Sequence, residues 1–475
     1  IPYGISDFNR LRNDNFYFVD KTIYLPLIER MPSYLSLTRP RRFGKSLFLS
    51  MMRTYYDLLQ RDNFDRYFGD LWIGAHPTDQ RNHYQVLYFD FSKAGCSVPG
   101  DGMMASFNEY SSLVINQFAD DYASFYDPDF KSTVESISSA KAKLSYIELK
   151  AKAKGYPLYL TIDEYDNFTN VILSEHGQKM FHDLTHASGF YREYFKQYKG
   201  MFDRIFLMGV SPVTLDDLSS GYNIDWNIST DSRFNAMMGF SETEVREMFR
   251  YYQENDALPG DIEAMIAEMK PWYDNYCFAR MSLGDDRVFN CDMTLYYLRS
   301  QFDFHRSPEE MVDKNIRTDY SKLKMLARID HDSAHEGSRM STIEEIATKG
   351  EILVNLHTSF PAERVADVDN FRSLLYYYGL LTMCGTRGDR LRMCIPNHCV
   401  REQYFGFLRE YYQQAHPLDL SRLKDQIDDL AYDGVWKPFF ESIACAYREN
   451  SSVRDGMEGE RNLQGFLKRS EEHTS

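Results

Sequence analysis

The chain has 475 residues, enough for roughly two to four domains, and its hydrophobic content of 43% can fill substantial cores. A net charge of −16 excludes a general attraction to nucleic acid or anionic membrane, although a local basic groove stays open. No apolar run approaches the ~20 residues of a membrane span. The seven cysteines include no C-x-x-C pair and favour reduced thiols in the cytoplasm. Cys394, His398 and Cys399 lie close in sequence but lack the second ligand cluster that a metal site needs.

The N-terminal elements lead into a strand, a loop and a helix. Residues 17–19 predict a short strand, followed by a helix that Asp20 or Thr22 caps and that runs through Glu29. The apolar run at residues 34–37 predicts another strand, and the amphipathic stretch after Gly44 predicts a helix over residues 45–60. Between these two elements stands the basic loop TRPRRFGKS, residues 38–46.

This basic loop has the features of a phosphate-binding loop. The N–H groups at a helix start have no partner within the helix and carry partial positive charge, so they bind phosphate. Lys45 can reach the β- and γ-phosphates, and the Ser46 hydroxyl can ligate Mg²⁺. Arg39 stands where the usual G-x-x-x-x-G-K-S/T pattern has its first glycine, and two or three guanidiniums can add phosphate contacts. The alternative is a basic turn that caps a helix. The nucleotide-binding residues that we expect are Arg41, Arg42, Phe43, Gly44, Lys45, Ser46 and Leu47.

A second motif, PLYLTIDEYD at residues 157–166, strengthens the first interpretation. It is a short β-prone run that ends in two adjacent acids, Asp163 and Glu164. Acids at the end of a buried strand are costly unless they meet a cation or a substrate. We expect Asp163 to hold Mg²⁺ together with Ser46, and Glu164 to activate a water molecule as general base. Asp90, which ends another apolar run, is a weaker candidate for the magnesium ligand.

The remaining N-terminal elements predict an α/β fold. Strands are expected at residues 84–92 and 204–211, and helices at residues 107–126 and 132–154. Strands that alternate with helices indicate βαβ units, and hence a three-layer core with a mainly parallel sheet and its ligand at the carboxyl ends of the strands. Ser211 falls at such an end. It either positions the γ-phosphate or the water, or caps the next helix.

The pattern changes after residue 239. Ser241 and Glu244 form a capping-box signature for a helix, and helical patterns continue to about residue 330, interrupted by an aromatic loop at 271–278 and a short strand at 288–289. Residues 331–341 read as a polar turn or linker. A helix at 371–382, a hairpin that ends with residues 390–396 and a helix at 400–414 suggest a winged-helix-like module. Such modules bind DNA in some proteins and pack against an ATPase core in others, and the acidic chain favours packing.

An ordered set of motifs resembles the bacterial AAA-ATPase-like family. In chain order it consists of IPYGISDF, YFVDKT, RPRRFGKS, LTIDEYD, FLMGVSP, GFSETEV, WYDNYCF, VFN, LLYYYGLLT and IPNHCVR, and it extends to about residue 410. The resemblance implies a P-loop ATPase of the additional-strand, catalytic-glutamate class, in which RPRRFGKS is the Walker A loop and LTIDEYD the Walker B strand. Two positions depart from the family pattern. Asn275 stands where a glycine is usual, and Ser211 where threonine is common.

The resemblance also implies a domain order. We expect an ATPase core at residues 1–239, a helical lid-like subdomain at 240–330 and the winged-helix-like module at 331–430. Residues 431–468 would begin a PD-(D/E)XK nuclease-like domain that is truncated here, and residues 469–475 read as a sequencing-adapter artefact. The strand-borne Asp and E-x-K core of such a nuclease is missing from the sequence.

These expectations converge on an ATP-binding protein, a slow Mg²⁺-dependent ATPase that acts as a conformational switch in the cytoplasm. Turnover should be slow because no arginine finger stands out, Arg204 and Arg233 being the candidates. One alternative is a nucleotide-stabilised interaction module without significant turnover. Another is a DNA nuclease gated by ATP in the full-length protein, and a kinase is a weaker interpretation. The expected partners are nucleotide and either a protein or a second copy of the chain. DNA would bind only through the winged-helix-like or missing domain.

Overall fold

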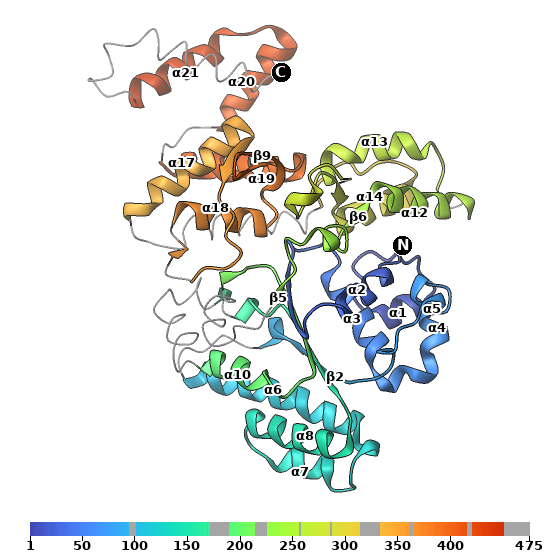
Figure 1. Ribbon diagram of the computed structural model, residues 1–475. Helices are drawn as coiled ribbons and strands as arrows, with labels where there is room; N and C mark the ends of the chain where they lie inside the picture. The colour runs from blue at the N-terminus through green and yellow to red at the C-terminus, as the bar shows by residue number, and fades with distance from the viewer. Residues whose placement is uncertain are drawn as a thin grey trace. The chain divides into compact units, whose positions relative to one another are not determined.

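The computed structural model describes residues 1–94, 101–168, 170–171, 190–213, 226–255, 258–285, 287–313, 333–361, 364–365, 367–415 and 420–450. The chain divides into two compact units, Ile1–Gly406 and Phe407–Ser475 (Figure 1). All the expected site residues belong to the first unit.

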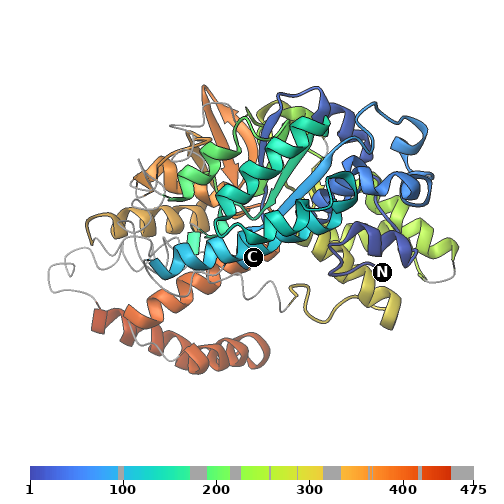
Figure 2. The ribbon, with the colours of Figure 1, turned by 90° about the horizontal axis from the view of Figure 1, so that it is seen from below.

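The first unit is built on a parallel sheet of five strands in the order β2-β3-β4-β1-β5. All six residues of β3 are buried, as expected for a strand that is covered on both faces. Figures 1 and 2 show the helices α1–α5 to one side of these strands and α6, α8 and α10 to the other. The expected α/β class and mainly parallel sheet are therefore confirmed. The strands are β1 (Tyr34–Thr38), β2 (Gln85–Asp90), β3 (Leu158–Asp163), β4 (Arg204–Gly209) and β5 (Trp226–Asn227).

The helix expected at 107–126 begins at Asp101 and ends at Asp121, and three further segments of this part differ from the expectation. The strand expected at residues 17–19 is absent, since that segment has no ladder partner. The helix after the basic loop ends at Tyr56 because Asp57 is extended and its side chain accepts from Leu59 N, which starts a 3₁₀ turn. The helix expected at 132–154 is two helices, broken at residues 137–139. The α-helices are α1 (Phe8–Asn13), α2 (Leu25–Glu29), α3 (Lys45–Tyr56), α4 (Phe64–Phe68), α5 (Trp72–Ala75), α6 (Asp101–Asp121), α7 (Phe130–Ser136), α8 (Ala140–Lys154) and α10 (Phe190–Tyr198).

A helical region follows the sheet. It contains β6 (Phe240–Ser241), α12 (Glu242–Glu254), α13 (Ile262–Tyr273), β7 (Val288–Phe289) and α14 (Cys291–Phe304). The capping box at Ser241 and Glu244 is confirmed. The expected aromatic loop begins later than predicted, because Pro271 lies inside α13. Asn275 has φ 83°, so it takes the left-handed conformation that glycine favours. The helices share an apolar core that includes Val245, Phe249, Met269, Tyr273, Tyr297 and Leu298.

The last part of the unit holds a three-stranded antiparallel sheet in the order β8-β10-β9. Its hairpin, β9 with β10, is the one that the sequence predicts, whereas the winged-helix assignment stays a prediction. The linker expected at 331–341 is wrong from Ser333 onward, where a helix begins that buries Arg339 and Met340; residues 331–332 lie outside the described residues. The elements are α17 (Ser333–Lys349), β8 (Glu351–Val354), α18 (Val368–Tyr377), β9 (Thr382–Arg387), β10 (Arg390–Cys394) and α19 (His398–Ala415).

The second unit contains α20 (Leu420–Asp433) and α21 (Lys437–Asn450) among its described residues. The expected nuclease-like start at 431–468 falls on it only in part, and residues 451–475, with the expected artefact, lie outside the described residues. No helix in the described part of the chain combines the length and the apolarity that crossing a bilayer requires. Within the same residues, no group of three or more His, Cys, Asp or Glu side chains could hold a metal ion.

Candidate nucleotide-binding site

The basic loop joins the carboxyl end of β1 to the start of α3. Gly44 has φ 82°, a left-handed conformation that glycine adopts without strain, and it is the N-cap of α3. No side chain among the described residues caps this helix end, so its first N–H groups stay available to an anion. The loop therefore has the main-chain geometry that the sequence predicts for phosphate binding.

Lys45 lies inside this loop rather than in solvent. Its side chain is 4% exposed, and its Nζ donates to the carbonyl oxygen of Pro40 at 3.1 Å. One weak acceptor does not satisfy a buried ammonium group, which has three protons to donate. Lys45 is thus placed to accept an anionic partner within the loop.

Ser46 and Asp163 meet although 116 residues separate them in the chain. Asp163 ends β3 and is 2% exposed. Burial raises the pKa of the Asp163 carboxyl to about 6, while the nearby Ser46 side chain and the positive charge of Lys45 lower it. The structure therefore brings the expected magnesium pair and the loop lysine together.

Glu164, the expected general base, has an unusual backbone. Its φ is 50°, in the left-handed region that non-glycine residues seldom occupy, and its N–H donates to Asp163 Oδ1 at 3.0 Å. Such a conformation costs on the order of 1–3 kcal/mol and is typical of functional sites. The side chain is half-buried and lines the same cavity as Lys45. Of the two acids, Glu164 faces the space where a ligand would lie.

Asp90, the weaker candidate for the magnesium ligand, is engaged elsewhere. It is in register with Asp163 on the neighbouring strand, but its carboxylate accepts from Ser92 N at 3.1 Å and from Ser92 Oγ at 2.6 Å. It also pairs with Lys93 at 3.1 Å. Ser46 lowers the pKa of Asp163 against the larger effect of burial, so the surroundings favour Asp163 over Asp90.

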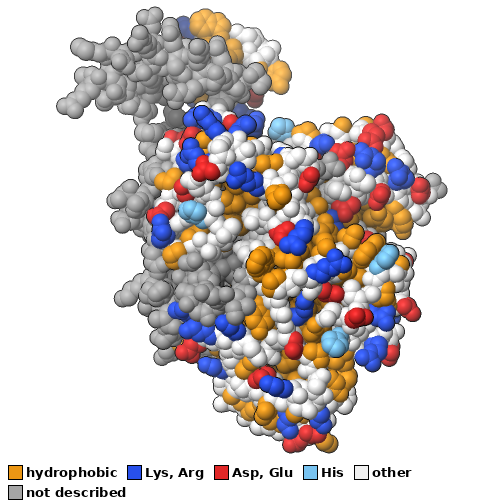
Figure 3. Space-filling model, viewed as in Figure 1, with side chains coloured by type: hydrophobic (Ala, Val, Ile, Leu, Met, Phe, Trp, Pro, Cys, Tyr) orange, Lys and Arg blue, Asp and Glu red, His pale blue; other side chains and the backbone are white. Residues whose placement is uncertain are grey.

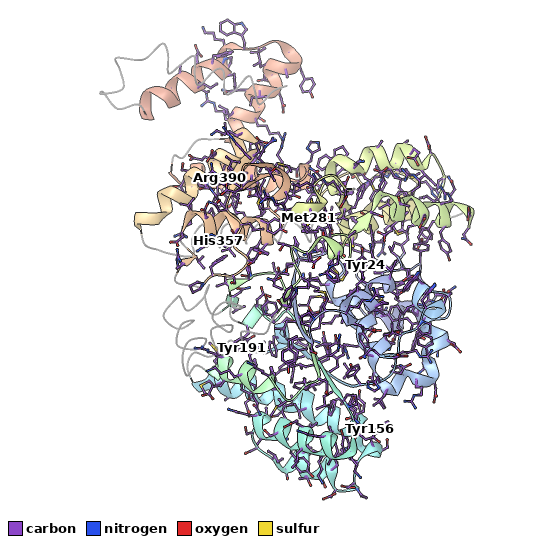
Figure 4. All side chains as sticks on the ribbon, viewed as in Figure 1. Tyr24, Tyr156, Tyr191, Met281, His357 and Arg390 are labelled. Carbon is purple, nitrogen blue, oxygen red and sulfur yellow. The ribbon has the colours of Figure 1, made fainter. Side chains whose placement is uncertain are left out.

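Asp166 is a site residue that the sequence analysis missed. Its buried carboxylate accepts from Val210 N at 3.0 Å and from Ser211 N at 2.7 Å, which fixes the turn after β4. Burial raises its pKa, and the negative charge of Glu164 raises it further. Tyr191, labelled in Figure 4, donates to the carbonyl of Tyr165 in the segment that follows β3. In the sequence, the presence of a third acid three positions after Asp163 could have indicated this residue.

Ser211 lies at the tip of β4, as predicted, but it is 1% exposed. Its Oγ accepts from Val213 N at 3.3 Å, which is the capping geometry that the sequence left open. Burial raises the pKa of Tyr378, a residue from the α18–β9 connection, and the nearby Ser211 side chain lowers it. The position agrees with either expected role, and a contact with the γ-phosphate stays a prediction.

The arginines of the loop have different surroundings. Arg39 is fully buried; it donates to the carbonyls of Thr38, Ser229 and Phe234, and its guanidinium lies 4.4 Å from the centre of the Phe278 ring. Burial lowers the pKa of Arg39 to about 10. The expectation that a third guanidinium adds phosphate contacts is therefore wrong for Arg39, which holds the loop to the rest of the unit.

Arg41 and Arg42 both line the cavity, Arg41 as an exposed residue. Arg42 has φ 69°, and its Nη1 lies 3.4 Å from the Asp292 carboxylate at the start of α14. Phe43 offers its main-chain N–H to the site, because its ring is buried against Tyr276, with ring centres 4.8 Å apart. Leu47 lies in the first turn of α3 and lines the cavity beside Ser46.

The two arginine-finger candidates lie away from this site. Arg204 begins β4, so it lies at the amino ends of the parallel strands, whereas the basic loop lies at their carboxyl ends. Its Nη2 donates to the carbonyl of Glu29 at 2.6 Å. Arg233 is bound by the carboxylate of Asp231 through its Nε and Nη2. The prediction of an arginine finger is therefore wrong for Arg204 within its own chain. The guanidinium of Arg233 is directed at the carboxylate of Asp231.

A cavity of about 410 Å³ joins these parts. Small-molecule pockets of this size bury most of a ligand, with a few polar groups that fix its orientation. Here the polar groups come from the basic loop and Glu164. The rest of the wall comes from the N-terminal segment and the helical region, with Ile5, Phe18, Val19, Met237, Met238 and Met248 among its apolar residues.

Lys21 connects the two walls of this cavity. Its Nζ donates to the carbonyl of Ala236 at 2.9 Å and pairs with Glu244 at 2.6 Å. Glu244 also completes the capping box of α12, so the motifs YFVDKT and GFSETEV meet at this ion pair. The sequence analysis used both motifs for the resemblance but did not predict their contact.

Comparisons with known proteins agree with the N-terminal motifs. A curated protein of Azotobacter chroococcum mcd 1, the "Uncharacterized protein in vnfD 5'region", is 28% identical over 316 residues, which are 64% of this chain and 52% of that protein. The chain thus spans about half the length of the curated relative that it matches.

Three solved structures are similar at low identity. The Aeropyrum pernix ORC1 protein in complex with DNA is 12% identical, with 84% of this chain and 90% of that chain covered and a TM-score of 0.29. Cdc6p from Pyrobaculum aerophilum is 11% identical, with 82% and 92% covered and a TM-score of 0.29. The Aeropyrum pernix ORC2 protein in ADPNP–ADP complexes is 10% identical, with 82% and 92% covered and a TM-score of 0.35.

The family comparison covers the part of the chain that holds the basic loop and both acids. Motifs after residue 219, from GFSETEV to IPNHCVR, lie beyond it. Residues 2–219 match the model of the AAA-ATPase-like family, whose description is "Predicted AAA-ATPase".

Proposed function

We propose that this chain binds ATP with Mg²⁺ and hydrolyses it slowly, as a conformational switch. One observation carries the proposal. Lys45, Ser46 and Glu164 line one cavity, beside the buried Asp163 carboxyl and at a helix start that is uncapped. Residues with no other reason to meet supply the ligands that a magnesium-bound triphosphate requires.

The chemistry of Ser46 and Asp163 fits a cation. Asp163 is a buried acid whose pKa is raised by burial, and a buried carboxylate is stabilised when a cation replaces its lost water. Magnesium prefers hard oxygen ligands and keeps several waters, so two protein oxygens are sufficient. Mg²⁺ bound there would neutralise charge on the phosphates.

The remaining residues divide the work between binding and hydrolysis. Lys45 and the N–H groups of residues 43–47 bind the β- and γ-phosphates, and Arg41 and Arg42 add charge. Arg42 would exchange its Asp292 partner for a phosphate oxygen. Glu164 accepts a proton from the attacking water, and Ser211 is a further polar group near the γ-phosphate.

Slow turnover follows from the arginines. Neither Arg204 nor Arg233 is directed at the cavity, so within the described residues neither finger candidate stabilises the transition state. An arginine finger contributes about 10³–10⁵ in rate to such enzymes. A nucleotide-stabilised interaction module is the second candidate, favoured by the ion pair between Arg42 and Asp292, which ties the basic loop to the helical region.

We also propose a cytoplasmic location, a bacterial source, and either self-association or a protein partner. On the face shown in Figure 3, basic and acidic side chains are interspersed and hydrophobic side chains gather over the middle. Such a mixed surface gives no strong field for DNA. The nuclease fusion, and with it an ATP-gated nuclease, concerns chain that lies outside the described residues.

The proposal is tested with two substitutions and matched controls. Lys45→Ala should weaken ATP binding by about 10- to 100-fold, the worth of a charge-assisted contact, whereas Lys131→Ala, which removes an exposed lysine paired with Asp120, should not. Glu164→Gln should retain binding and lose about 10²–10⁴ in phosphate release, whereas Glu193→Gln, an exposed acid paired with Lys141, should retain both. Equal binding by the two lysine variants would remove the nucleotide site. Full phosphate release by Glu164→Gln would remove the general base and leave the binding module.

A further inference from the structure

A second cavity, of about 440 Å³, lies between the end of α13 and the segment that joins β10 to α19. Within the described part of the chain it shares no lining residue with the nucleotide cavity. Most of its wall is polar or charged, and these residues are Glu242, Lys270, Asp274, Asn275, Asp285 and Arg287. A wall of this kind favours a small charged ligand over an apolar one.

Hydrogen bonds fix the main chain around this cavity. The side chain of Asn275, whose own main chain is left-handed, donates from Nδ2 to the carbonyl of Pro396 at 2.8 Å. In the opposite direction, Nδ2 of Asn397 donates to the carbonyl of Asp274 at 3.0 Å. The two segments that form the wall are thus held together without a ligand.

The carboxylate of Asp274 is left incomplete by this network. The residue is 5% exposed, and its Oδ1 has no hydrogen-bond partner among the described residues. Burial raises the pKa of the carboxyl, as expected where a charged group has lost its water. A buried carboxylate oxygen without a donor costs free energy, so a donor that reaches it is bound favourably. The last torsion of an aspartate side chain has a broad energy minimum, so the carboxylate can turn either oxygen towards the cavity.

The basic side chains of the wall are directed at other partners. Lys270 pairs with Glu242 at 2.5 Å, and Nη1 of Arg287 donates to the carbonyl of Met383 at 2.7 Å. Their charges lower the pKa of Asp274, yet its Oδ1 stays without a donor. The lining contains three acids and two bases, and one acid is already paired. The ligand that completes this wall is therefore a cation rather than an anion.

We propose that this cavity binds a small organic cation, an ammonium or guanidinium compound, which donates an N–H group to the Asp274 carboxylate. Such ions have several donors and no acceptor, which is what an incomplete carboxylate requires. A bare metal ion fits less well, because the described residues offer no group of three or more His, Cys, Asp or Glu side chains to hold it. Pro271 and Pro396 give the carbon part of the ligand an apolar surface.

This site goes beyond the proposed ATPase and does not depend on it. It gives a function to WYDNYCF, the motif that contains Asp274 and that lies outside the segment matched by the family model.

Equilibrium dialysis of the full chain tests the proposal. The probes are radiolabelled methylguanidinium and ethylammonium, at constant ionic strength and without nucleotide. At least one of them should bind at a single site per chain with a Kd of about 1 mM or lower. Asp274→Asn should weaken this binding by about 10- to 100-fold, the worth of a charge-assisted contact. Lys270→Gln should tighten it by about threefold, because a positive charge leaves the wall.

Two controls separate one site from a general attraction of cations to a chain with a net charge of −16. Asp303→Asn removes the same charge from an exposed acid that pairs with Arg299 and lies outside the cavity lining, so it should leave the Kd unchanged. Acetate, the control ligand, should show no saturable binding.

Each possible result supports the inference or overturns it. Equal weakening by Asp274→Asn and Asp303→Asn would show a diffuse attraction and overturn it. Saturable binding of acetate in place of the cations, or no saturable binding of either cation, would do the same. If Asp274→Asn fails to fold, Lys270→Gln decides, since a Kd no lower than that of the unaltered chain would remove the cation site. A chain that binds the cation without releasing phosphate from ATP would overturn only the proposed function.

Discussion

At the scale of single residues, the buried carboxyl of Asp163 lowers the stability of the folded protein at neutral pH. Burial raises the pKa of its carboxyl from 3.8 to about 6, so the native state binds a proton that the unfolded chain releases. Stability therefore falls as the pH rises from about 4 to about 6, and it stays lower above that window. Protein stability is lowered here at a group that we propose to bind a cation, which is a common relation between stability and function.

Asp163→Asn should stabilise the protein in the absence of Mg²⁺ and nucleotide. The shift from 3.8 to about 6 corresponds to about 3 kcal/mol at neutral pH, because one pKa unit is worth 1.36 kcal/mol. The gain should disappear near pH 4, where the carboxyl is protonated in both states. Urea unfolding at pH 7.5 and pH 4 measures it. Asp14→Asn, an exposed acid paired with Arg10, is the control and should change stability by no more than about 0.5 kcal/mol. A variant that is less stable at pH 7.5 would contradict the expected cost of the buried charge.

The sequence identified the ligand-facing residues better than the residues that hold them. Gly44, Lys45, Ser46 and Asp163 follow from a local pattern, since a strand, a loop and a helix place them without further information. Arg39 and Asp166 do not, because their partners are main-chain groups brought close by tertiary folding. The environment of a buried polar side chain depends on these distant segments, and a pattern of nearby residues does not contain it.

At the scale of elements, α14 contributes an acid to the site. Asp292 lies in its first turn, where the helix dipole favours a carboxylate, and it pairs with Arg42 at 3.4 Å. Burial raises its pKa, and Arg42 lowers it. A phosphate group in the cavity would repel this carboxylate and compete with it for Arg42. The start of α14 is therefore the place where the helical region would respond to a nucleotide.

Asp292→Asn should tighten nucleotide binding by about tenfold, because it removes one negative charge from beside the phosphates and from beside Arg42. The Kd for Mg²⁺–ATP at pH 7.5, measured at low and high salt, checks this. Asp303→Asn changes net charge equally on the same helix, but its acid pairs with Arg299, so its Kd should not change. Weaker binding by Asp292→Asn would mean that this carboxylate contacts the nucleotide favourably.

The elements themselves were predicted unevenly, for physical reasons. The four long strands of the parallel sheet were found because their apolar runs have a clear signal. Residues 17–19 have the same composition, but the ring of Tyr17 packs against α12, 4.8 Å from that of Tyr251, and the ring of Phe18 packs against that of Phe8 in α1. The polar stretch from Ser333 is helical since burial of Arg339 and Met340 overrides its composition.

At the scale of the whole molecule, every residue of the candidate site belongs to the unit Ile1–Gly406. The last helix that begins in this unit, α19, ends at Ala415. A chain that stops there keeps the helix whole, along with the sheet, the helical region and the α18–β9 connection. Nucleotide binding should then not depend on the residues that follow.

A chain of residues 1–415 should therefore show the same thermal stabilisation by Mg²⁺–ATP as the full chain. A ligand at one hundred times its Kd adds about 2.7 kcal/mol to the stability of the state that binds it, which raises the Tm by a few degrees. Thermal scans of both chains, with and without nucleotide, measure this increase in Tm. The Lys45→Ala variant of each chain is the control, because its Tm should not rise when nucleotide is added. Equal increases would place the whole nucleotide site in the first unit. A full-length increase that is lost in residues 1–415, with the helical circular dichroism of the shorter chain intact, would mean that the second unit contributes residues to the site.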